Sequence, residues 1–458
     1  MKKQDPKKRI SFLLMVLIGI ALPVVCRADQ TAPRTLTIDQ AVQMAMENNL
    51  QRRVAQYGVK IARDKISQSF SAYGPTLTVD GGYNHYNEEP SEVQLKKGLV
   101  DLNNAFSMNS PSLHIPIQQE PSDSLDYHGY QFHLTQPLYT GHKLTATKNQ
   151  AKANGKNAEA NLTAAENDVV LSVKKAYYNV VLCQQLNVTM DEAVASMEKH
   201  LEEANAYYKV NVVPKLDVLR AEEKLADLKQ KQLLAQNNLI LAKSSLNYAL
   251  GVDLGNDYSC KDDPGYGPPP RDLTACQAQA LKERPEIAAI NAQIDMARQS
   301  VWIAESNYKP TVALVANQAH YEPENASPSK TVGVVATMKL FDSGMVLHQI
   351  AEAKDTLKQA QTGKELLQRG IKLQVEQAYH NVEVSLKTIE VAQKSLDTAK
   401  ETLQVADTRY KVGLSTSLER LDAEVGLTQA KTNHTQALSM YHIALAELDR
   451  AIGKKNND

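Results

Sequence analysis

The stretch FHLTQPLYTGHKL, at Phe132–Leu144, is echoed about two hundred residues later by VVATMKLFDSGMVL, at Val334–Leu347. In both stretches, residues that alternate between apolar and polar lead into a Leu-aromatic pair, small polar residues and a long helical segment. Such alternation is typical of a β-strand with one buried face. The sequence therefore predicts the same strand-to-helix junction twice in one chain.

The duplication extends over most of the chain. At an offset of 235 residues, SAYGPT (Ser71–Thr76) matches SNYKPT (Ser306–Thr311), and at an offset of 202 residues AYYNV (Ala176–Val180) matches AYHNV (Ala378–Val382). The offset falls by 33 because the first half carries an extra segment, rich in Pro, Ser and Asn, within residues 86–130. An insertion of this composition indicates a surface loop.

Each repeat is predicted to contain a helix, two strands and a long pair of helices joined by a tip turn. Large residues recur every seven positions in the second half, at Val375, Val382, Ile389, Leu396, Leu403 and Tyr410. A sustained heptad seam is typical of coiled-coil packing. The predicted boundaries are a first repeat at 29–251 (strands about 75–87 and 128–139, tip turn near 209–216), a Pro/Gly-rich linker at 252–272, and a second repeat at 273–458 (strands about 310–321 and 331–341, tip turn near 411–418).

The predicted strands are each about ten residues long, which is the length and pattern of an outer-membrane barrel strand. An ordinary half-buried hairpin is the alternative, and for a single strand it is the more common one. Four strands cannot close a barrel, since small barrels need about eight. We therefore expect several chains to contribute strands to one barrel.

The N-terminus has the pattern of a secretory signal peptide, predicted over residues 1–28. Five basic residues precede the apolar run Ile10–Val25, and Cys26 and Ala28 are small residues suited to cleavage before Asp29. Lipidation of Cys26 is not favoured, because Pro23 and Val25 stand where a lipidation motif has other residues. No other segment approaches 18 apolar residues, so no membrane-spanning helix is expected after cleavage.

Composition narrows the class of partner. Only 5% of residues are aromatic, which suits long, closely packed helices, and the net charge of −1 gives no reason to expect nucleic acid. Cys260 and Cys276 flank a Pro/Gly-rich stretch, so in an oxidising compartment we expect a disulfide between them. Cys183 lies on a helical stripe and is predicted to be a small buried residue.

Five motifs together resemble the outer-membrane efflux (TolC-like) family. They are LTIDQAVQMAMENN (Leu36–Asn49), SAYGPTL (Ser71–Leu77), QPLYTGHK (Gln136–Lys143), KLFDSG (Lys339–Gly344) and YKVGLSTSLERLDAE (Tyr410–Glu424). The resemblance implies a mainly α fold with a β-barrel portion, in which a homotrimer builds a twelve-stranded barrel in the outer membrane of a Gram-negative bacterium and a helical tunnel in the periplasm. It further implies a passive exit duct of a tripartite efflux or type I secretion system, in contact with outer-membrane lipid, a periplasmic adaptor protein and an energised inner-membrane pump.

The resemblance also implies an entrance gate at the periplasmic tip. Glu419 and Asp422 match acidic positions that would form rings at the constricted entrance, while Tyr410 and Asp217 match a pair that links the coiled coils in the closed state. The basic residue that the family has at Ser415 is missing. Alternatively, the two carboxylates stabilise a helix start through the helix dipole, and Tyr410 simply ends a heptad stripe.

Two apolar turns are candidate contacts for the adaptor. They contain Val212, Val213 and Pro214 in the first repeat and Gly413 and Leu414 in the second. Exposed apolar residues at the end of a rod indicate an interaction surface. Plain helix-hairpin turns are the alternative.

No catalytic pattern is found, so neither enzyme activity nor a cofactor is expected. The sequence lacks HExxH and CxxC, and its histidines near the first hairpin have no zinc-site spacing: His85, His114, His128, His133 and His142. We expect these to be loop or barrel-lining residues. A structural coiled-coil envelope protein without channel activity remains the alternative function, although it would leave the amphipathic hairpins unexplained.

Overall fold

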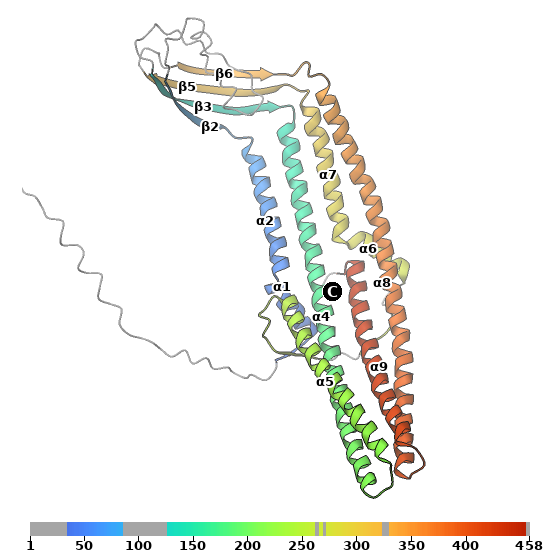
Figure 1. Cartoon of the computed structure of the whole chain (residues 1–458). Helices are drawn as coiled ribbons and strands as arrows, with labels where there is room; N and C mark the ends of the chain where they lie inside the picture. Colours follow the sequence, from blue (N-terminus) through green and yellow to red (C-terminus); the bar gives the residue numbers. More distant parts are fainter. Residues whose placement is uncertain (1–33, 86–125, 262–264, 269–271, 323–328, 455–458) are drawn as a thin grey trace, which may run out of the picture.

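The computed structural model describes residues 34–85, 126–261, 265–268, 272–322 and 329–454. The predicted signal peptide with Cys26, and the first hairpin loop with His114, lie outside these residues. Figure 1 shows a rod of long helices, with a sheet at one end and two helical hairpin turns at the other.

The helices of the two halves match in length. The pairs are α1 (Ile38–Asn48) and α6 (Leu273–Glu283) with 11 residues each, α2 (Leu50–Ser71) and α7 (Pro285–Ser306) with 22, α4 (Lys143–Lys209) and α8 (Met345–Lys411) with 67, and α5 (Lys215–Leu250) and α9 (Ser417–Ile452) with 36. At 1.5 Å per residue, α4 and α8 each span roughly 100 Å. The predicted tandem repeat is confirmed.

One four-stranded antiparallel sheet caps the rod. Its order is β2 (Thr76–His85), β3 (Asp126–Thr140), β5 (Thr311–Glu322) and β6 (Ser329–Thr337). The central β3–β5 pairing joins the two repeats. The last strand was predicted to continue to residue 341 but ends at Thr337. Thr337 pairs with Thr311, where β5 begins, so the chain beyond it has no strand opposite to pair with.

The repeated junction has the same backbone geometry in both halves. Gly141 and His142 have φ of 60° and 72°, and Ser343 and Gly344 have φ of 56° and 86°. Two successive left-handed residues therefore turn each strand into a long helix. Gly141 is required for a second reason, since a Cβ there would lie 2.6 Å from the Cβ of Lys309.

A second, two-stranded sheet lies beside the rod. β1 (Arg34–Leu36) pairs in parallel with β4 (Tyr258–Cys260), which falls inside the predicted linker at 252–272. The buried hydroxyl of Tyr177 on α4 lies 2.9 Å from the carbonyl oxygen of Leu36 and 3.0 Å from that of Lys261. These strands were missed in the sequence because three residues are too short to show a period.

The predicted disulfide is wrong. Cys260 is an unbonded thiol, buried in the hydrophobic cluster that α1, α4 and α5 form. Cys276 is fully buried in a different cluster, formed by α6, α8 and α9 of the second repeat. The two thiols therefore belong to the cores of different repeats. Cys183 is half-buried and packs against the first cluster.

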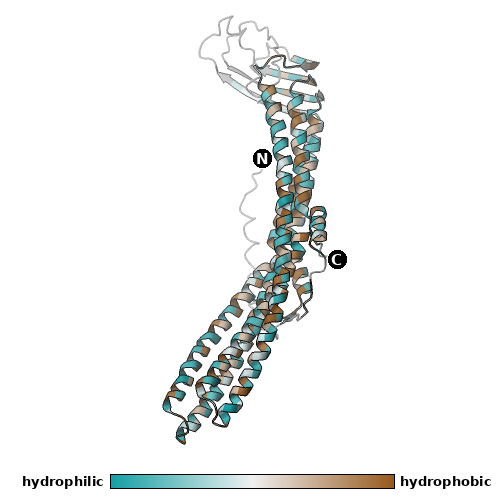
Figure 2. Ribbon diagram, turned by 90° about the vertical axis from the view of Figure 1, so that its right-hand side faces the viewer, coloured by the Kyte–Doolittle hydropathy of each residue, from teal (hydrophilic) through white to brown (hydrophobic). Residues whose placement is uncertain are grey.

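The heptad seam forms the core of the rod. Val375, Val382 and Ile389 are each 0% exposed, as the seven-residue spacing predicted. Apolar and polar residues alternate along the helices in Figure 2. Among the described helices, none has a window apolar enough and long enough to cross a membrane.

Candidate functional site at the hairpin tips

The two hairpin tips share one turn geometry. Asn211 and Gly413 follow α4 and α8 with φ of 56° and 75°. In each turn a backbone N–H returns to the last helical turn, from Val212 to Tyr207 at 2.9 Å and from Leu414 to Arg409 at 2.8 Å. Asn thus replaces Gly at the left-handed position, which Asn tolerates.

The apolar residues proposed for docking lie on these turns. Val212 is 68% exposed and Leu414 is 71% exposed. Pro214 and Gly413 are also exposed, while Val213 is half-buried. Four of the five predicted docking residues therefore face outward at the end of the rod. Their binding role stays a prediction.

Glu419 and Asp422 lie one helical turn apart at the start of α9. Both are exposed and line a groove of about 770 Å³ between α8 and α9. The rest of the lining is Val391, Lys394, Ser395, Thr398, Ala399, Thr402, Ala423 and Gly426. The structure therefore brings the two predicted gate carboxylates into one groove, with a single lysine opposite them.

Helix capping also explains why a carboxylate stands at position 419, in the first turn of α9. The Thr416 hydroxyl caps α9 by accepting the Glu419 N–H at 3.3 Å, and the Ser415 hydroxyl donates to the Glu419 carboxylate. A carboxylate in the first turn is favourable for any helix. Asp422 makes no such cap, so it is the clearer of the two candidates for a role at the entrance. That role remains a prediction.

Tyr410 is buried and lies near Asp217. Only 6% of Tyr410 is exposed, and its ring packs edge-on against His200 at 5.5 Å and Tyr207 at 6.0 Å between centroids. Burial raises the pKa of the Tyr410 hydroxyl, and the nearby negative charge of Asp217 raises it further. Its counterpart Tyr208 is 40% exposed, so only one of the two heptad-ending tyrosines is a core residue.

A buried charged residue that sequence reasoning missed lies beside Tyr410. Arg420 on α9 is 6% exposed, and its Nε lies 2.7 Å from Asp407 Oδ1 on α8. Its Nη2 is 4.0 Å from Glu203 Oε2 on α4, and its guanidinium lies 6.0 Å from the centre of the Tyr410 ring. One cation therefore contacts the first and second repeats together.

His200 completes a buried polar cluster with Tyr410, Arg420 and Asp407, called the Arg420 cluster. It is 1% exposed, and its Nε2 lies 3.2 Å from the Ser417 hydroxyl on α9. Among the described residues, its Nδ1 has no hydrogen-bond partner. Burial, helped by the positive charge of Arg420, lowers the His200 pKa to about 4, while Asp407 works in the opposite direction. His200 is therefore neutral at physiological pH.

Asp407 is held ionised. Burial alone would raise its pKa, but hydrogen bonds from Lys411 and Arg420 outweigh this and lower it. The Lys411 ammonium lies 2.6 Å from Oδ2 and the Arg420 Nε 2.7 Å from Oδ1. The cluster is thus one carboxylate held between two cations, beside a neutral imidazole.

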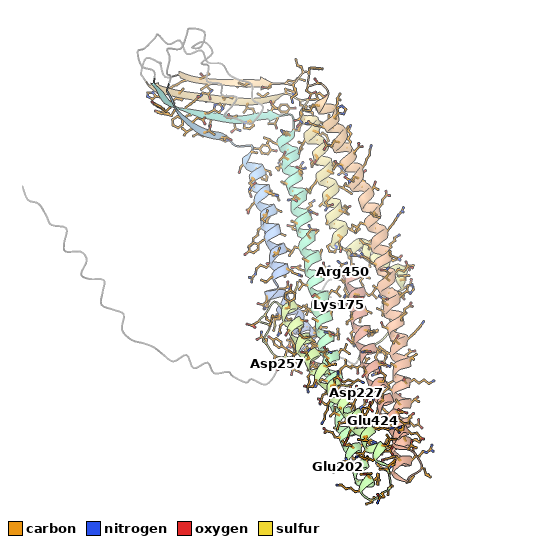
Figure 3. The ribbon with its side chains drawn as sticks, in the orientation of Figure 1. Lys175, Glu202, Asp227, Asp257, Glu424 and Arg450 are labelled. Atoms are coloured by element: carbon orange, nitrogen blue, oxygen red, sulfur yellow. The ribbon has the colours of Figure 1, made fainter. Side chains whose placement is uncertain are left out.

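Ion pairs also connect α4 to α9 further along the rod. Lys431 pairs with Glu192 at 2.6 Å, Lys175 with Glu447 at 2.6 Å and Arg450 with Asp168 at 2.9 Å, each joining α4 to α9. Figure 3 shows Lys175 and Arg450 near the middle of the rod and Glu202 close to the tip. Repeats one and two are therefore attached along a seam that ends at the Arg420 cluster.

The histidines near the first hairpin do not form a metal site in the described part of the chain, where no group of three metal-ligating side chains occurs. His133 on β3 contacts Asn317 on β5 and Thr135, which fits a polar strand position. His142 begins α4 in a left-handed conformation. The side chains of His85 and His128 are outside the described set.

Comparison with known proteins fits this architecture. The outer membrane efflux protein family matches residues 41–252 and residues 277–454, one stretch in each repeat. The chain belongs to the outer membrane efflux protein family. It is therefore an outer-membrane protein of the class that carries efflux.

Individual efflux relatives are distant in sequence and near in fold. Outer membrane protein TolC of Escherichia coli is 22% identical over 466 residues, covering 97% of this chain and 87% of that protein. The structure of the outer-membrane channel OprN has a TM-score of 0.74 at 18% identity and covers 91% of this chain and 90% of that chain. The Campylobacter jejuni CmeC outer membrane channel also gives 0.74, at 15% identity, with 91% and 85% covered.

Proposed function

We propose that three copies of this chain form one closed barrel and one helical tunnel, which together act as a passive exit duct. The observation that carries the proposal is the sheet order β2-β3-β5-β6, in which β2 and β6 are the edges. Edge strands present backbone groups that need a partner. Since β2 and β6 run in opposite directions, β6 of one copy can pair antiparallel with β2 of the next. Three copies supply twelve strands, enough for closure.

The faces of the strands support contact with outer-membrane lipid. Leu77, Val79 and Tyr83 occupy alternate positions of β2 and are each about 60% exposed, and Val332 and Val334 of β6 are 74% and 63% exposed. An outward apolar face with this alternation is typical of barrel strands in a membrane.

The tips are the proposed periplasmic entrance. Three copies of Glu419 and Asp422 would form two acidic rings, which attract cations and select for them. The exposed Val212 and Leu414 would contact a periplasmic adaptor, which connects the duct to an inner-membrane pump. The duct itself supplies no energy.

Single-channel conductance in a planar bilayer tests the duct. We expect stepwise, cation-selective current from the purified protein and a loss of cation selectivity in the double variant Glu419→Gln/Asp422→Asn. The control is Asp397→Asn/Glu401→Gln, which removes two exposed carboxylates from α8 outside the groove. No current from a folded trimer would favour the structural coiled-coil protein instead. Equal selectivity in all three proteins would retain the duct and remove Glu419 and Asp422 from the entrance.

Photo-crosslinking in cells tests docking. A photoreactive residue at Val212 or Leu414 should give an adduct with a periplasmic adaptor, whereas the same residue at Leu254, which is 58% exposed but far from the tips, should not. Adducts of equal yield at all three positions would contradict docking at the tips.

A further inference from the structure

The buried polar cluster is a departure from the repeat. At the offset of 202 residues, Arg420 corresponds to Val218 and Asp407 corresponds to Asn205. Val218 is buried, with 6% exposed, as Arg420 is. The helical hairpin therefore folds with an apolar residue at this position. Burying a cation is unfavourable unless it is paired, and apolar replacements of buried ion pairs are often as stable or more so.

We propose that Arg420 holds α8 and α9 against α4 at neutral pH, and that protonation of His200 releases this contact. We call the contact the latch. The latch deepens the proposed function, because it would hold the periplasmic entrance closed. It also takes the place of the basic residue that is missing at Ser415.

The groups that face His200 come from two helices of the second repeat. On α8 they are Asp407 and Tyr410, and on α9 they are Ser417 and Arg420. Glu203 of α4 lies 4.0 Å from Arg420, while Tyr207 of α4 and Asp217 of α5 act on Tyr410. In this environment, the positive charge that acts on His200 is Arg420. Asp407 offsets part of that repulsion but is already engaged by Arg420 and Lys411.

A second proton on the imidazole has no place in the closed state. Nε2 shares a hydrogen bond with Ser417, and among the described residues nothing accepts a hydrogen from Nδ1. An imidazolium would therefore be a buried charge with one donor unsatisfied, beside another cation. Moving the start of α9 away from α4 would let water solvate it.

The direction of the pH effect on opening follows from the linkage between proton binding and conformation. The pKa of His200 is lowered from 6.5 to about 4 in the closed state, so the opened tip binds the proton more tightly. The closed state is fully favoured above pH 6.5 and loses stability as the pH falls from 6.5 toward 4. If the opened tip gives His200 its ordinary pKa, the opening equilibrium rises roughly 25-fold between pH 7.5 and pH 5.

Release would be confined to the tip. The Lys431–Glu192 pair and the Lys175–Glu447 pair join α4 and α9 further from the tip and contain no histidine. These two ion pairs would therefore hold while the last turns separate.

Hydrogen–deuterium exchange of the full-length protein in detergent tests the latch without requiring current. Peptides that cover residues 196–210 and 412–424 are compared at pH 7.5 and pH 5 between the parent and His200→Gln, which keeps a hydrogen-bonding side chain but cannot be protonated in this range. Intrinsic exchange rates cancel when two proteins are compared at one pH. The control is His434→Gln, because His434 on α9 also has its pKa lowered, first by burial, but lies outside the cluster.

We expect exchange at the tip of the parent to rise on acidification by roughly 25-fold more than in His200→Gln, with His434→Gln behaving as the parent. Arg420→Met should exchange faster than the parent already at pH 7.5, and should respond less to pH. The same pH response in the parent and His200→Gln would overturn the proposal. If the tip responds as expected but no protein conducts, the duct is wrong while the latch stands.

Discussion

Arg420 on α9 lies 2.7 Å from Asp407 on α8, with 8% of the Arg420 side chain exposed. The pair closes the tip of the second hairpin onto itself, and Arg420 extends it to Glu203 on α4. A pair of this kind is costly to break and inexpensive to replace, because loss of one partner strands the other charge.

The first prediction follows from that asymmetry. Arg420→Ala should lower the free energy of unfolding by about 2–4 kcal/mol, since Glu203 loses its cation and Asp407 keeps only Lys411 in a part-buried site. Arg420→Met should cost less, because methionine is an apolar side chain at position 420, as Val218 is at the equivalent position of the first repeat. Denaturation followed by far-ultraviolet circular dichroism gives both values. Lys400→Ala, which removes a 3.8 Å pair on the surface, is the control and should cost below about 0.5 kcal/mol.

The second prediction concerns the strand-to-helix junction. Gly141→Ala should destabilise the protein by about 1–3 kcal/mol, because the φ of 60° disfavours a Cβ and that Cβ would meet Lys309. Ser343→Gly, at the equivalent position with φ of 56°, should stabilise it by up to about 1 kcal/mol. Thermal unfolding midpoints of the two variants should move in opposite directions; midpoints that move together would contradict the shared geometry.

The third prediction uses the duplication as its own control. Tyr177→Phe should cost about 1–3 kcal/mol, because the buried hydroxyl bonds to the chain at both Leu36 and Lys261. Its counterpart at the offset of 202, Tyr379, is half-buried in the second repeat. Tyr379→Phe should therefore change stability by less than about 0.5 kcal/mol. Equal effects would mean that the hydrogen bonds of the Tyr177 hydroxyl to Leu36 and Lys261 add nothing to stability.

The fourth prediction concerns the cysteines. Burial raises the pKa of the Cys260 thiol to about 12, so in the folded protein it should not react with iodoacetamide at pH 8. After unfolding without reductant, both Cys260 and Cys276 should be alkylated, as mass spectrometry of the two peptides would show. Alkylation that appears only after reduction would show that Cys260 and Cys276 form a disulfide.

The sequence predicted the elements that repeat and recur. The seven-residue spacing of Val375, Val382 and Ile389 reports a buried seam directly, because one face of a long helix packs against one partner along its whole length. The two offsets predicted the equal helix lengths, and the alternating residues predicted the strands. Short elements without a period, such as β1 and β4, left no comparable signal.

The buried charges at the tip were not predicted. Glu419 and Asp422 were predicted from their motif, but no role was predicted for Arg420, which lies between them. Placing Val218 beside Arg420 at the offset of 202 would have flagged a charge where the other repeat keeps an apolar residue. Its partners Asp407 and Glu203 lie 13 and 217 residues away along the chain, so no local pattern names them.

By itself, then, the sequence determined the duplication, the long heptad helices, the strands and the junction that joins them, because each is a local periodicity repeated many times. Only the tertiary structure decided which charges meet and which thiols stay apart. Those outcomes depend on where helix α4 of the first repeat lies against helices α8 and α9 of the second. Packing between segments some two hundred residues apart sets the burial of His200 and Arg420, and burial sets their chemistry.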